Sequence, residues 1–549
     1  MRETNMKKAI SMSKLLPVVM LALALLFTAT AHAAAPGITG TGGAGTFNLT
    51  ARTAYLTQPD GQSIYSWGYG CTTSAATFVP TAIAAPSGGC AAMQVPGPTL
   101  IVTEGQPFTV NLTNGLPTSA GNTSILFPGI TVTSITSGTP GLLTQEAAPG
   151  GTVTYHLVAS TPGTRAYYSG TQGDLQVEMG LYGAIIVLPS NSTVLSGCAS
   201  AQTGNLAAEG AHGESDFRLA AAAYDHPHTC YDREYLFQFS EMDPTIHTQA
   251  LAQVTAKGNC SVTAPTCSLE VATEPYHPAY FMINGRSMPD DMDPNYAIQY
   301  PHQPYNGNPH MHPGELTLIR VIGQGRWQHP FHEHGNHVRI LGRDGNLILS
   351  ASDATKLAGP LQFTTTTTPG MAFDGIFYWT AKGLNWDAYG HNPASLDPTA
   401  NLSCTPDANG YNTGDPTAIN YYEWCQDHDK PVQAAPFGDV AGGGPVTLPD
   451  ANLFTNGAWY GGSPYLGPNA TLRATGCSAG VSAPAAGCGA TGSTPPSGTI
   501  ANSPSGEAGF AFMWHSHNER EITTNNIFPG GMLMMMLVDS REFVIDESM

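Results

Sequence analysis

Two pairs of alternating histidines are the residues of this sequence best suited to chemistry. The stretch WQHPFHEHGNH carries His332 and His334, and the stretch WHSHNEREI carries His515 and His517. Alternate residues of an extended strand share one face, so each pair points its two imidazoles the same way. If the two strands lie side by side, four imidazoles converge, and imidazole is a ligand that suits copper or zinc. The sequence therefore predicts a metal site. The alternative is that each pair is only a polar strand edge.

Other possible ligands have simpler explanations. The methionines of GGMLMMMLV offer thioethers to copper, but alternate members are better explained as core residues of a closing strand. Glu519 and Glu521 are expected to be solvated loop charges, with a role as acceptors that orient an imidazole as the alternative. Two further alternating pairs lie on proline-flanked segments, and we expect them to be surface polar residues: His226, His228, His310 and His312.

The elements that position these side chains are predicted to be β-strands. Only 11% of the residues are charged, 62 are glycine and 43 are proline, a balance typical of many short strands joined by turns. Apolar, β-branched and aromatic runs predict strands at residues 101–103, 108–112, 183–188, 235–239, 279–283, 316–322, 338–341, 373–378 and 508–513. We therefore predict an all-β protein.

The 549 residues divide into several predicted segments. Residues 38–195 are expected to form one β domain and residues 215–384 a second. Residues 385–506 are rich in Gly, Pro, Ala, Asn and Asp, which predicts a loop-rich, disulfide-bearing insertion or degenerate domain. Residues 507–549 are expected to supply the C-terminal strands that complete the last domain.

The N-terminal residues and the cysteines predict export. Lysines precede an apolar run at residues 15–27, and small residues follow it, so residues 1–33 read as a signal peptide. We expect a periplasmic or extracellular protein without a membrane span. The net charge of −20 argues against a nucleic-acid partner. Ten cysteines allow many connectivities, and because they fall as close neighbours the simplest pairing gives five local disulfides: Cys71–Cys90, Cys198–Cys230, Cys260–Cys267, Cys404–Cys425 and Cys477–Cys488.

Several motifs resemble one known family. HPFHEHG resembles the HPxHxHG signature of multicopper oxidases, and WHSH followed by PGGM resembles their terminal HCHxxxHxxxGM segment. PGPTL, TSILFPG and GLYGAIIV are similar to segments of the family's first domain. The resemblance implies tandem cupredoxin-like Greek-key β-sandwich domains. It also implies that His329 faces the type 1 copper pocket with Met532 as candidate axial residue, and that four histidines serve the trinuclear cluster: His332, His334, His515 and His517.

The chain departs from the family pattern at most other ligand positions. Leu126 and Pro128 occupy the histidine places of the first motif, and Tyr168 and Gly170 occupy those of the second. Ser516 replaces the type 1 cysteine, and a neutral hydroxyl cannot supply the soft thiolate of a blue-copper site. Glu521 stands where the second type 1 histidine falls. Ligands for about one copper remain.

Three functions follow from this pattern. The first is an exported multicopper-oxidase-like protein that binds one copper ion, or zinc, through the residual histidines, with degenerate type 1 and trinuclear sites. The second is an active copper-dependent oxidoreductase of laccase or metal-oxidase type, with a small-molecule or metal-ion substrate and ligands shared across a homo-oligomer. Every identical subunit would lack a histidine at the same four positions of the first domain, which disfavours this function: Leu126, Pro128, Tyr168 and Gly170. The third is a metal-free structural or interaction module on a cupredoxin scaffold.

Overall fold

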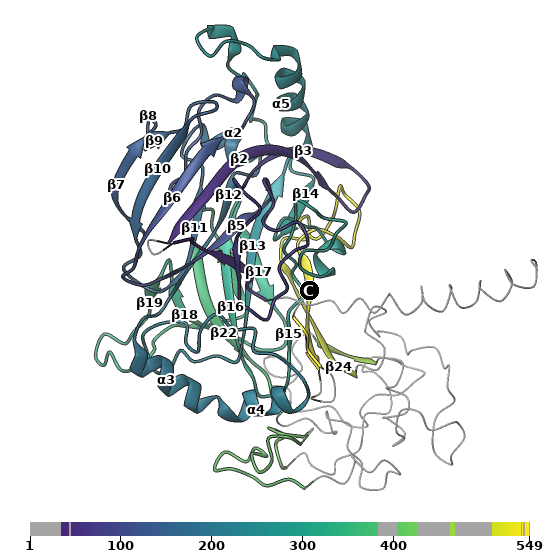
Figure 1. Cartoon of the computed structure of the whole chain (residues 1–549). Helices are drawn as coiled ribbons and strands as arrows, with labels where there is room; N and C mark the ends of the chain where they lie inside the picture. Colours follow the sequence, from purple (N-terminus) through teal and green to yellow (C-terminus); the bar gives the residue numbers. More distant parts are fainter. Residues whose placement is uncertain are drawn as a thin grey trace, which may run out of the picture.

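The computed structural model describes residues 34–42, 45–380, 382, 403–418, 420–426, 462–466, 508–539, 541 and 544–547. The predicted signal peptide and most of the predicted insertion at 385–506 lie outside these residues. The described chain forms two β-sandwiches that follow each other along the sequence (Figure 1). The predicted all-β, tandem cupredoxin-like fold is therefore confirmed.

The first sandwich packs two five-stranded sheets around one core. Strands β6 and β10 alternate buried and less buried residues, as the period-2 pattern of a half-buried strand requires. One sheet contains, in order, β11 (Gly163–Tyr168), β12 (Tyr182–Leu188), β5 (Gly97–Thr103), β1 (Gly37–Thr39) and β4 (Thr77–Val79). The other contains β3 (Ser63–Cys71), β2 (Thr46–Thr57), β6 (Pro107–Asn114), β10 (Thr152–Val158) and β7 (Thr131–Ser137). A small hairpin, β8 (Thr139–Pro140) and β9 (Gln145–Glu146), lies beside them.

The second sandwich carries the histidine motifs. Its larger sheet runs β14 (Tyr280–Ile283), β13 (Arg233–Met242), β16 (Leu316–Gly323), β22 (Ala372–Tyr378), β18 (Val338–Arg343) and β19 (Asn346–Leu347), with β20 (Leu361–Gln362) pairing β18. Its other sheet runs β15 (His310–Met311), β25 (Leu533–Asp539), β24 (Ala508–Ser516), β17 (His329–Glu333) and β21 (Thr364–Thr367). Strand β23 (Gly462–Leu466), from within the segment predicted to be an insertion, pairs with β24.

The core between these two sheets is dominated by aromatic and methionine side chains. Phe237, Phe331 and Trp514 contact one another edge to face, with ring centroids 6.0 to 6.3 Å apart. Alternate methionines of GGMLMMMLV are completely buried in the same core: Met532, Met534 and Met536. The prediction that these methionines pack the core is confirmed.

The structure also contains helices that we did not predict. They are α2 (Gly173–Gln176), α3 (Ser192–Ala201), α4 (Thr203–Ala211) and α5 (Pro244–Lys257), together with the 3-10 turns Thr118–Ala120, Pro265–Cys267 and Asp290–Met292. The two longest have the capping residues that start helices, because the Asn191 side chain accepts from the first turn of α3 and Asp243 does so for α5. Pro244 at the first position of α5 adds to that signal.

Four predicted disulfides are confirmed: Cys71–Cys90, Cys198–Cys230, Cys260–Cys267 and Cys404–Cys425. The fifth, Cys477–Cys488, lies outside the described residues. Among the described residues, no helix has the length and apolar character needed to cross a membrane.

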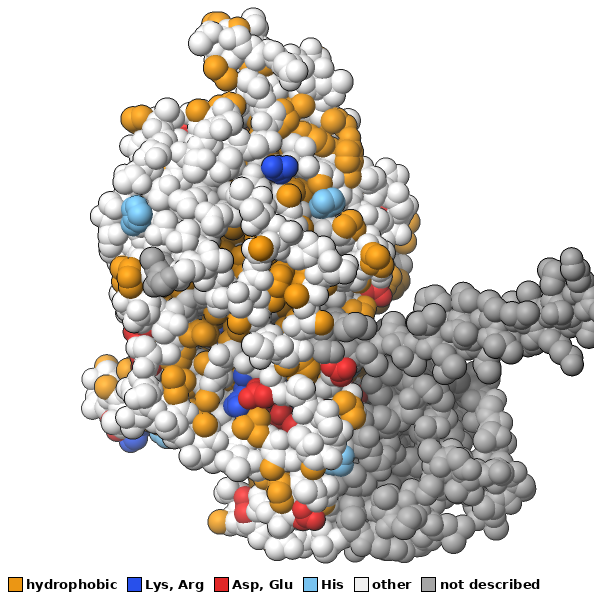
Figure 2. All heavy atoms as spheres, viewed as in Figure 1, with side chains coloured by type: hydrophobic (Ala, Val, Ile, Leu, Met, Phe, Trp, Pro, Cys, Tyr) orange, Lys and Arg blue, Asp and Glu red, His pale blue; other side chains and the backbone are white. Residues whose placement is uncertain are grey.

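A buried carboxylate joins the two sandwiches. Asp374 of β22 accepts hydrogen bonds from the Thr164 backbone and hydroxyl of β11, at 3.0 and 2.5 Å, and from the Tyr224 hydroxyl at 2.6 Å. The guanidinium of Arg320 lies 3.4 Å from the same carboxylate. On the face drawn in Figure 2, hydrophobic side chains gather in a band along the middle of the molecule, and few charged ones are visible.

Candidate metal centre

Strand register brings the two histidine motifs together. Strands β17 and β24 are antiparallel neighbours, and their register sets His332 directly opposite His515. His334 and His517 come just after the ends of their strands. The predicted convergence of the two H-x-H segments therefore occurs, because facing residues of paired strands lie within side-chain reach.

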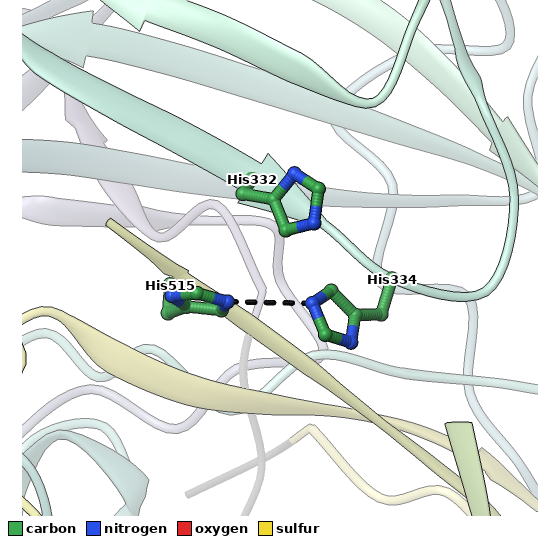
Figure 3. A group of neighbouring side chains, drawn as sticks. All are labelled: His332, His334 and His515. Carbon is green, nitrogen blue, oxygen red and sulfur yellow. Dashed lines mark hydrogen bonds between the residues drawn. The ribbon is translucent and has the colours of Figure 1, made fainter. Parts of the chain in front are cut away.

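Three of the imidazoles form a compact group. The ligand atoms of His332, His334 and His515 all lie within 4.8 Å of one another. The Nε2 atoms of His334 and His515 are 3.3 Å apart, and Figure 3 shows these two rings pointing toward each other with His332 beside them. This geometry suits one ion held by imidazole nitrogens, since a shared ion must lie within bonding distance of each ring.

The ring of His517 lies close to the other three but is more exposed. Its centroid is 4.8 Å from that of His332 and 5.5 Å from that of His515. Its side chain is 53% exposed, and its Nδ1 atom lies 3.6 Å from a carboxylate oxygen of Glu519. It is not one of the three residues whose ligand atoms meet, so a change of its side-chain rotamer would be needed to make it a fourth ligand.

Two of the three imidazoles, those of His332 and His515, are oriented and neutral, as metal ligands must be. Nδ1 of His332 contacts the Thr364 hydroxyl at 2.6 Å, and Nδ1 of His515 contacts the Ser516 carbonyl at 2.7 Å, so Nε2 is the candidate ligand atom of each. Burial, with the neighbouring imidazoles adding to it, lowers the pKa of His332 to about 3. Burial also lowers the pKa of His515. Both rings are unprotonated at neutral pH, so the donor set fits a copper or zinc ion.

His329 does not lie among these rings but in a chain of carboxylates. Its Nδ1 atom lies 2.8 Å from Oε2 of Glu521, and its Nε2 atom lies 3.0 Å from Oε2 of Glu241. The Ser516 hydroxyl donates a short hydrogen bond to the same Glu521 oxygen. Burial alone would lower the pKa of His329, but the hydrogen bonds to Glu241 and Glu521 outweigh it and raise the pKa to about 9.

The type 1 copper position expected from the resemblance is therefore occupied by protein atoms. One carboxylate oxygen of Glu521 touches both the imidazole of His329 and the hydroxyl of Ser516, the two residues expected to flank that copper. A protonated imidazole between two carboxylates forms a buried ion-pair cluster here, and its positive charge offsets part of theirs. The expected role of Met532 as an axial ligand stays a prediction. Its side chain is fully buried in the core, and its carbonyl accepts from the Ser516 amide at 3.0 Å.

Several side chains differ from what the sequence led us to expect. Glu521 is not a solvated loop charge, because its carboxylate is buried against His329, whereas Glu519 is exposed.

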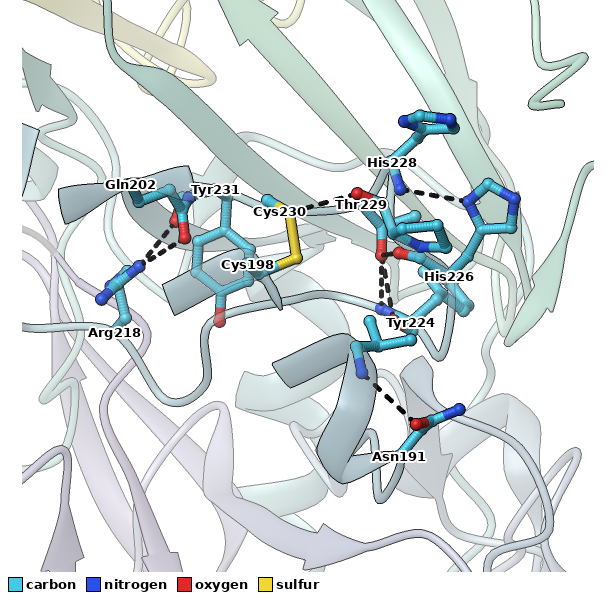
Figure 4. The surroundings of a disulfide bond; sticks show 12 residues. Asn191, Cys198, Gln202, Arg218, Tyr224, His226, His228, Thr229, Cys230 and Tyr231 are labelled. Atoms are coloured by element: carbon cyan, nitrogen blue, oxygen red, sulfur yellow. Dashed lines mark hydrogen bonds between the residues drawn. A yellow bond between two sulfur atoms is a disulfide. The ribbon is translucent and has the colours of Figure 1, made fainter. Parts of the chain in front are cut away.

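Three of the four histidines expected at the surface are buried: His226, His310 and His312. Figure 4 shows His226 beside the Cys198–Cys230 disulfide, where its ring accepts from the His228 amide. His310 and His312 contact Asp539 and Glu214, at 2.8 and 2.6 Å. Carboxylates distant in sequence therefore satisfy the buried rings of His310 and His312, whereas the partner of His226 is local.

Two residues of the site carried no signal in the sequence. Glu241 lies 88 residues before His329 on another strand, and nothing around it marks it as a partner of an imidazole. Thr364 lies in a run of five threonines, and only the pairing of β21 with β17 sets it against His332.

The structure combines two β-sandwiches in tandem with an imidazole group on a pair of neighbouring strands in the second. The family described as multicopper oxidase matches residues 86–192, which include most of the first sandwich. In this region the chain is similar to multicopper oxidases. A multicopper oxidase from Talaromyces pinophilus is 34% identical over 101 residues, and a laccase from Aspergillus fumigatus is 37% identical over 98 residues. Each match covers 18% of this chain, and the chain spans only 16% of the length of each relative.

Two solved structures of copper oxidases are also similar to the chain. The multicopper oxidase mgLAC has a TM-score of 0.42 and 15% identity, with 90% of this chain and 85% of that one covered. A blue copper oxidase from Nitrosomonas europaea has a TM-score of 0.42 and 14% identity, with 89% and 85% covered.

Proposed function

We propose that this chain is an exported copper-binding protein that holds one copper ion through His332, His334 and His515. The observation that carries the proposal is the meeting of the three imidazoles within 4.8 Å. The similarity of residues 86–192 to multicopper oxidases supports copper as the metal. Zinc suits the same ligands, so the family is what favours copper over zinc.

The arrangement supports copper handling or a limited redox role. Copper bound here would supply a Lewis acid and a one-electron redox couple. The protein's own part is to present neutral Nε2 atoms, which Thr364 and the Ser516 carbonyl orient through Nδ1. Ser516 offers no thiolate for long-range electron delivery, and Leu126 and Tyr168 offer no imidazole. We therefore propose that the type 1 and trinuclear sites are degenerate, which disfavours a four-copper oxidase cycle.

Titration of the purified protein with Cu(II) tests this function. We expect about one bound copper per chain, a type 2 paramagnetic signal and no intense thiolate-to-copper band. His515→Ala should weaken copper binding by at least about a hundredfold, since a ligand contributes more than the tenfold to hundredfold of a residue that only orients one. His277→Ala, at an exposed position, is the matched control and should bind copper like the unaltered protein.

The other outcomes select the alternatives. About four coppers per chain with oxidase activity would contradict the proposal in favour of an active oxidoreductase with a small-molecule or metal-ion substrate, and the oligomeric state should then be measured. No bound copper in either variant or in the unaltered protein would favour a metal-free module. Preference for zinc over copper in a competition experiment would contradict only the identity of the metal and would leave the three-histidine site unchanged.

A further inference from the structure

A cavity of about 290 Å³ lies at the positions where the first domain has lost its metal ligands. Leu126, Tyr168 and Gly170 line it from the first sandwich, and Gln324 and Gly370 line it from the second. None of the described residues that line it belongs to the histidine group. The vacated positions therefore form a separate site at the junction of the two sandwiches, a place where small-molecule sites are common.

The walls of this cavity are fixed by backbone contacts. The amide of Leu126 donates to the carbonyl of Tyr168 at 2.7 Å, and the reverse bond measures 3.3 Å. Gly370 has a φ of +79°, and a Cβ there would lie 3.3 Å from the Tyr168 ring and hydroxyl. Glycine at this position satisfies the backbone and leaves space in front of the phenol.

Among the described residues, the lining offers a ligand one side-chain hydrogen-bond donor and no charge. No Asp, Glu, Lys, Arg or His occurs among the described residues that line the cavity. The Ser169 hydroxyl is already bonded to Gln176 at 2.7 Å, and the Gln324 amide donates to Gly183 and Gln238 at 3.0 and 3.1 Å. The Tyr168 hydroxyl remains, and burial raises the pKa of Tyr168, so it stays a neutral donor.

The mouth of the cavity carries an exposed apolar side chain. Leu143, in the turn between β8 and β9, lines the cavity and is 64% exposed. A ligand that covers it would remove apolar surface from water, which is favourable in proportion to the area covered. Its neighbour Leu142 is 93% exposed but does not line the cavity.

We propose that this cavity binds a small uncharged aromatic molecule with one acceptor oxygen, such as an aryl ketone or aldehyde. The volume is close to the lower end of the range of small-molecule pockets, which limits the ligand to one or two rings. The Tyr168 hydroxyl donates to the oxygen, while Leu126 and Leu143 contact the ring. Carboxylates and ammonium groups are disfavoured, because the wall has no charge to replace the water they would lose.

Calorimetric titration of the full chain with acetophenone tests this site, with ethylbenzene as the ligand lacking the oxygen and benzoate as the charged one. We expect saturable binding of acetophenone, weaker binding of ethylbenzene and none of benzoate. Tyr168→Phe should weaken acetophenone binding about threefold to tenfold, the worth of one hydrogen bond, and leave ethylbenzene unchanged. Leu143→Ala should weaken both ligands about fivefold, and Leu142→Ala should weaken neither.

Three results would overturn the proposal. They are the absence of saturable acetophenone binding, binding of benzoate at equal affinity, or an equal effect of the two leucine substitutions. Both leucines lie on an exposed turn, so their loss should not prevent folding. The titrations are to be run on copper-free and on copper-loaded protein. Because no residue of the histidine group lines this cavity, failure of copper binding would leave the expected acetophenone result unchanged.

Discussion

The ion pair of His329 with Glu241 and Glu521 makes stability depend on pH in a defined direction. The pKa of His329 is raised from 6.5 to about 9 by the carboxylates of Glu241 and Glu521. A raised pKa means that the folded state holds the proton more tightly than the unfolded chain. Its stabilisation is complete below about pH 6.5 and is lost as the pH rises through about 9. Raising the pKa of His329 from 6.5 to about 9 corresponds to about 3 kcal/mol of stabilisation.

Replacement of the imidazole by a neutral amide isolates this contribution. His329→Gln keeps a polar side chain of similar size but leaves two carboxylates buried without a positive charge, since Glu241 and Glu521 are both buried. We expect the variant to lose about 3 to 5 kcal/mol of unfolding free energy at pH 6. At pH 10, where the imidazole of the unaltered protein is neutral, the difference between the two proteins should shrink by about 3 kcal/mol.

Urea unfolding at pH 6 and pH 10, followed by fluorescence of the buried tryptophans, Trp514 among them, measures both differences. Titrating groups away from this cluster change stability in both proteins alike, so the comparison of the two differences reports His329 together with the two carboxylates that contact it. His277→Gln, at an exposed position, is the control and should match the unaltered protein at both pH values. A gap between His329→Gln and the unaltered protein that is equal at pH 6 and pH 10 would refute the reasoning.

Two further predictions concern the strands that carry the histidines. Ser516→Cys combined with Glu521→His should place a thiolate and two imidazoles at one point. Copper-loaded protein should then show intense thiolate-to-copper absorption. A folded variant without that absorption band would contradict the assigned type 1 position. Thr364→Val removes the hydroxyl 2.6 Å from Nδ1 of His332 and should weaken copper binding about tenfold to a hundredfold, as measured by competition with a chelator. Thr366→Val, at an exposed position of the same strand, should have no effect, and equal losses in the two variants would show that Thr364 does not orient the ligand.

The strands of both sandwiches could be predicted because their signal is local. Apolar and polar residues alternate in the segments that become β6 and β10 because one face of each strand is buried. This pattern does not depend on which element packs against that face. The same period put His332 and His334 on one side of their segment. Their meeting with His515 followed from a family resemblance, because the pairing of β17 with β24 joins residues about 180 positions apart.

The helices were missed for a different reason. Composition and short apolar runs favoured strands throughout, while the start signals at Asn191 and Asp243-Pro244 are single residues within otherwise ordinary sequence. Capping residues satisfy the first amides of a helix, so reading them locally would have located α3 and α5.

The fate of individual charged residues could not be read from the sequence. Glu519 and Glu521 are two positions apart in one loop, yet the side chain of Glu519 is 74% exposed and that of Glu521 is 1% exposed. What separates them is His329, which reaches Glu521 from another strand and supplies the charge that its burial requires. Such pairings depend on tertiary register, which no window of sequence contains.

The same pairing explains how the histidine strand can keep its shape without a copper at the type 1 position. Ser516 lies between His515 and His517. Its hydroxyl donates to Glu521, and its amide donates to the Met532 carbonyl. The amide of His517 donates to the Pro330 carbonyl at 2.8 Å. A metal at the type 1 position would tie the same strand end to His329 by coordination. Here the tie runs through the carboxylate of Glu521, which touches both Ser516 and His329, so the strand that carries His515 keeps its support. The serine hydroxyl and the glutamate together therefore hold the geometry of the imidazole group without a thiolate at position 516.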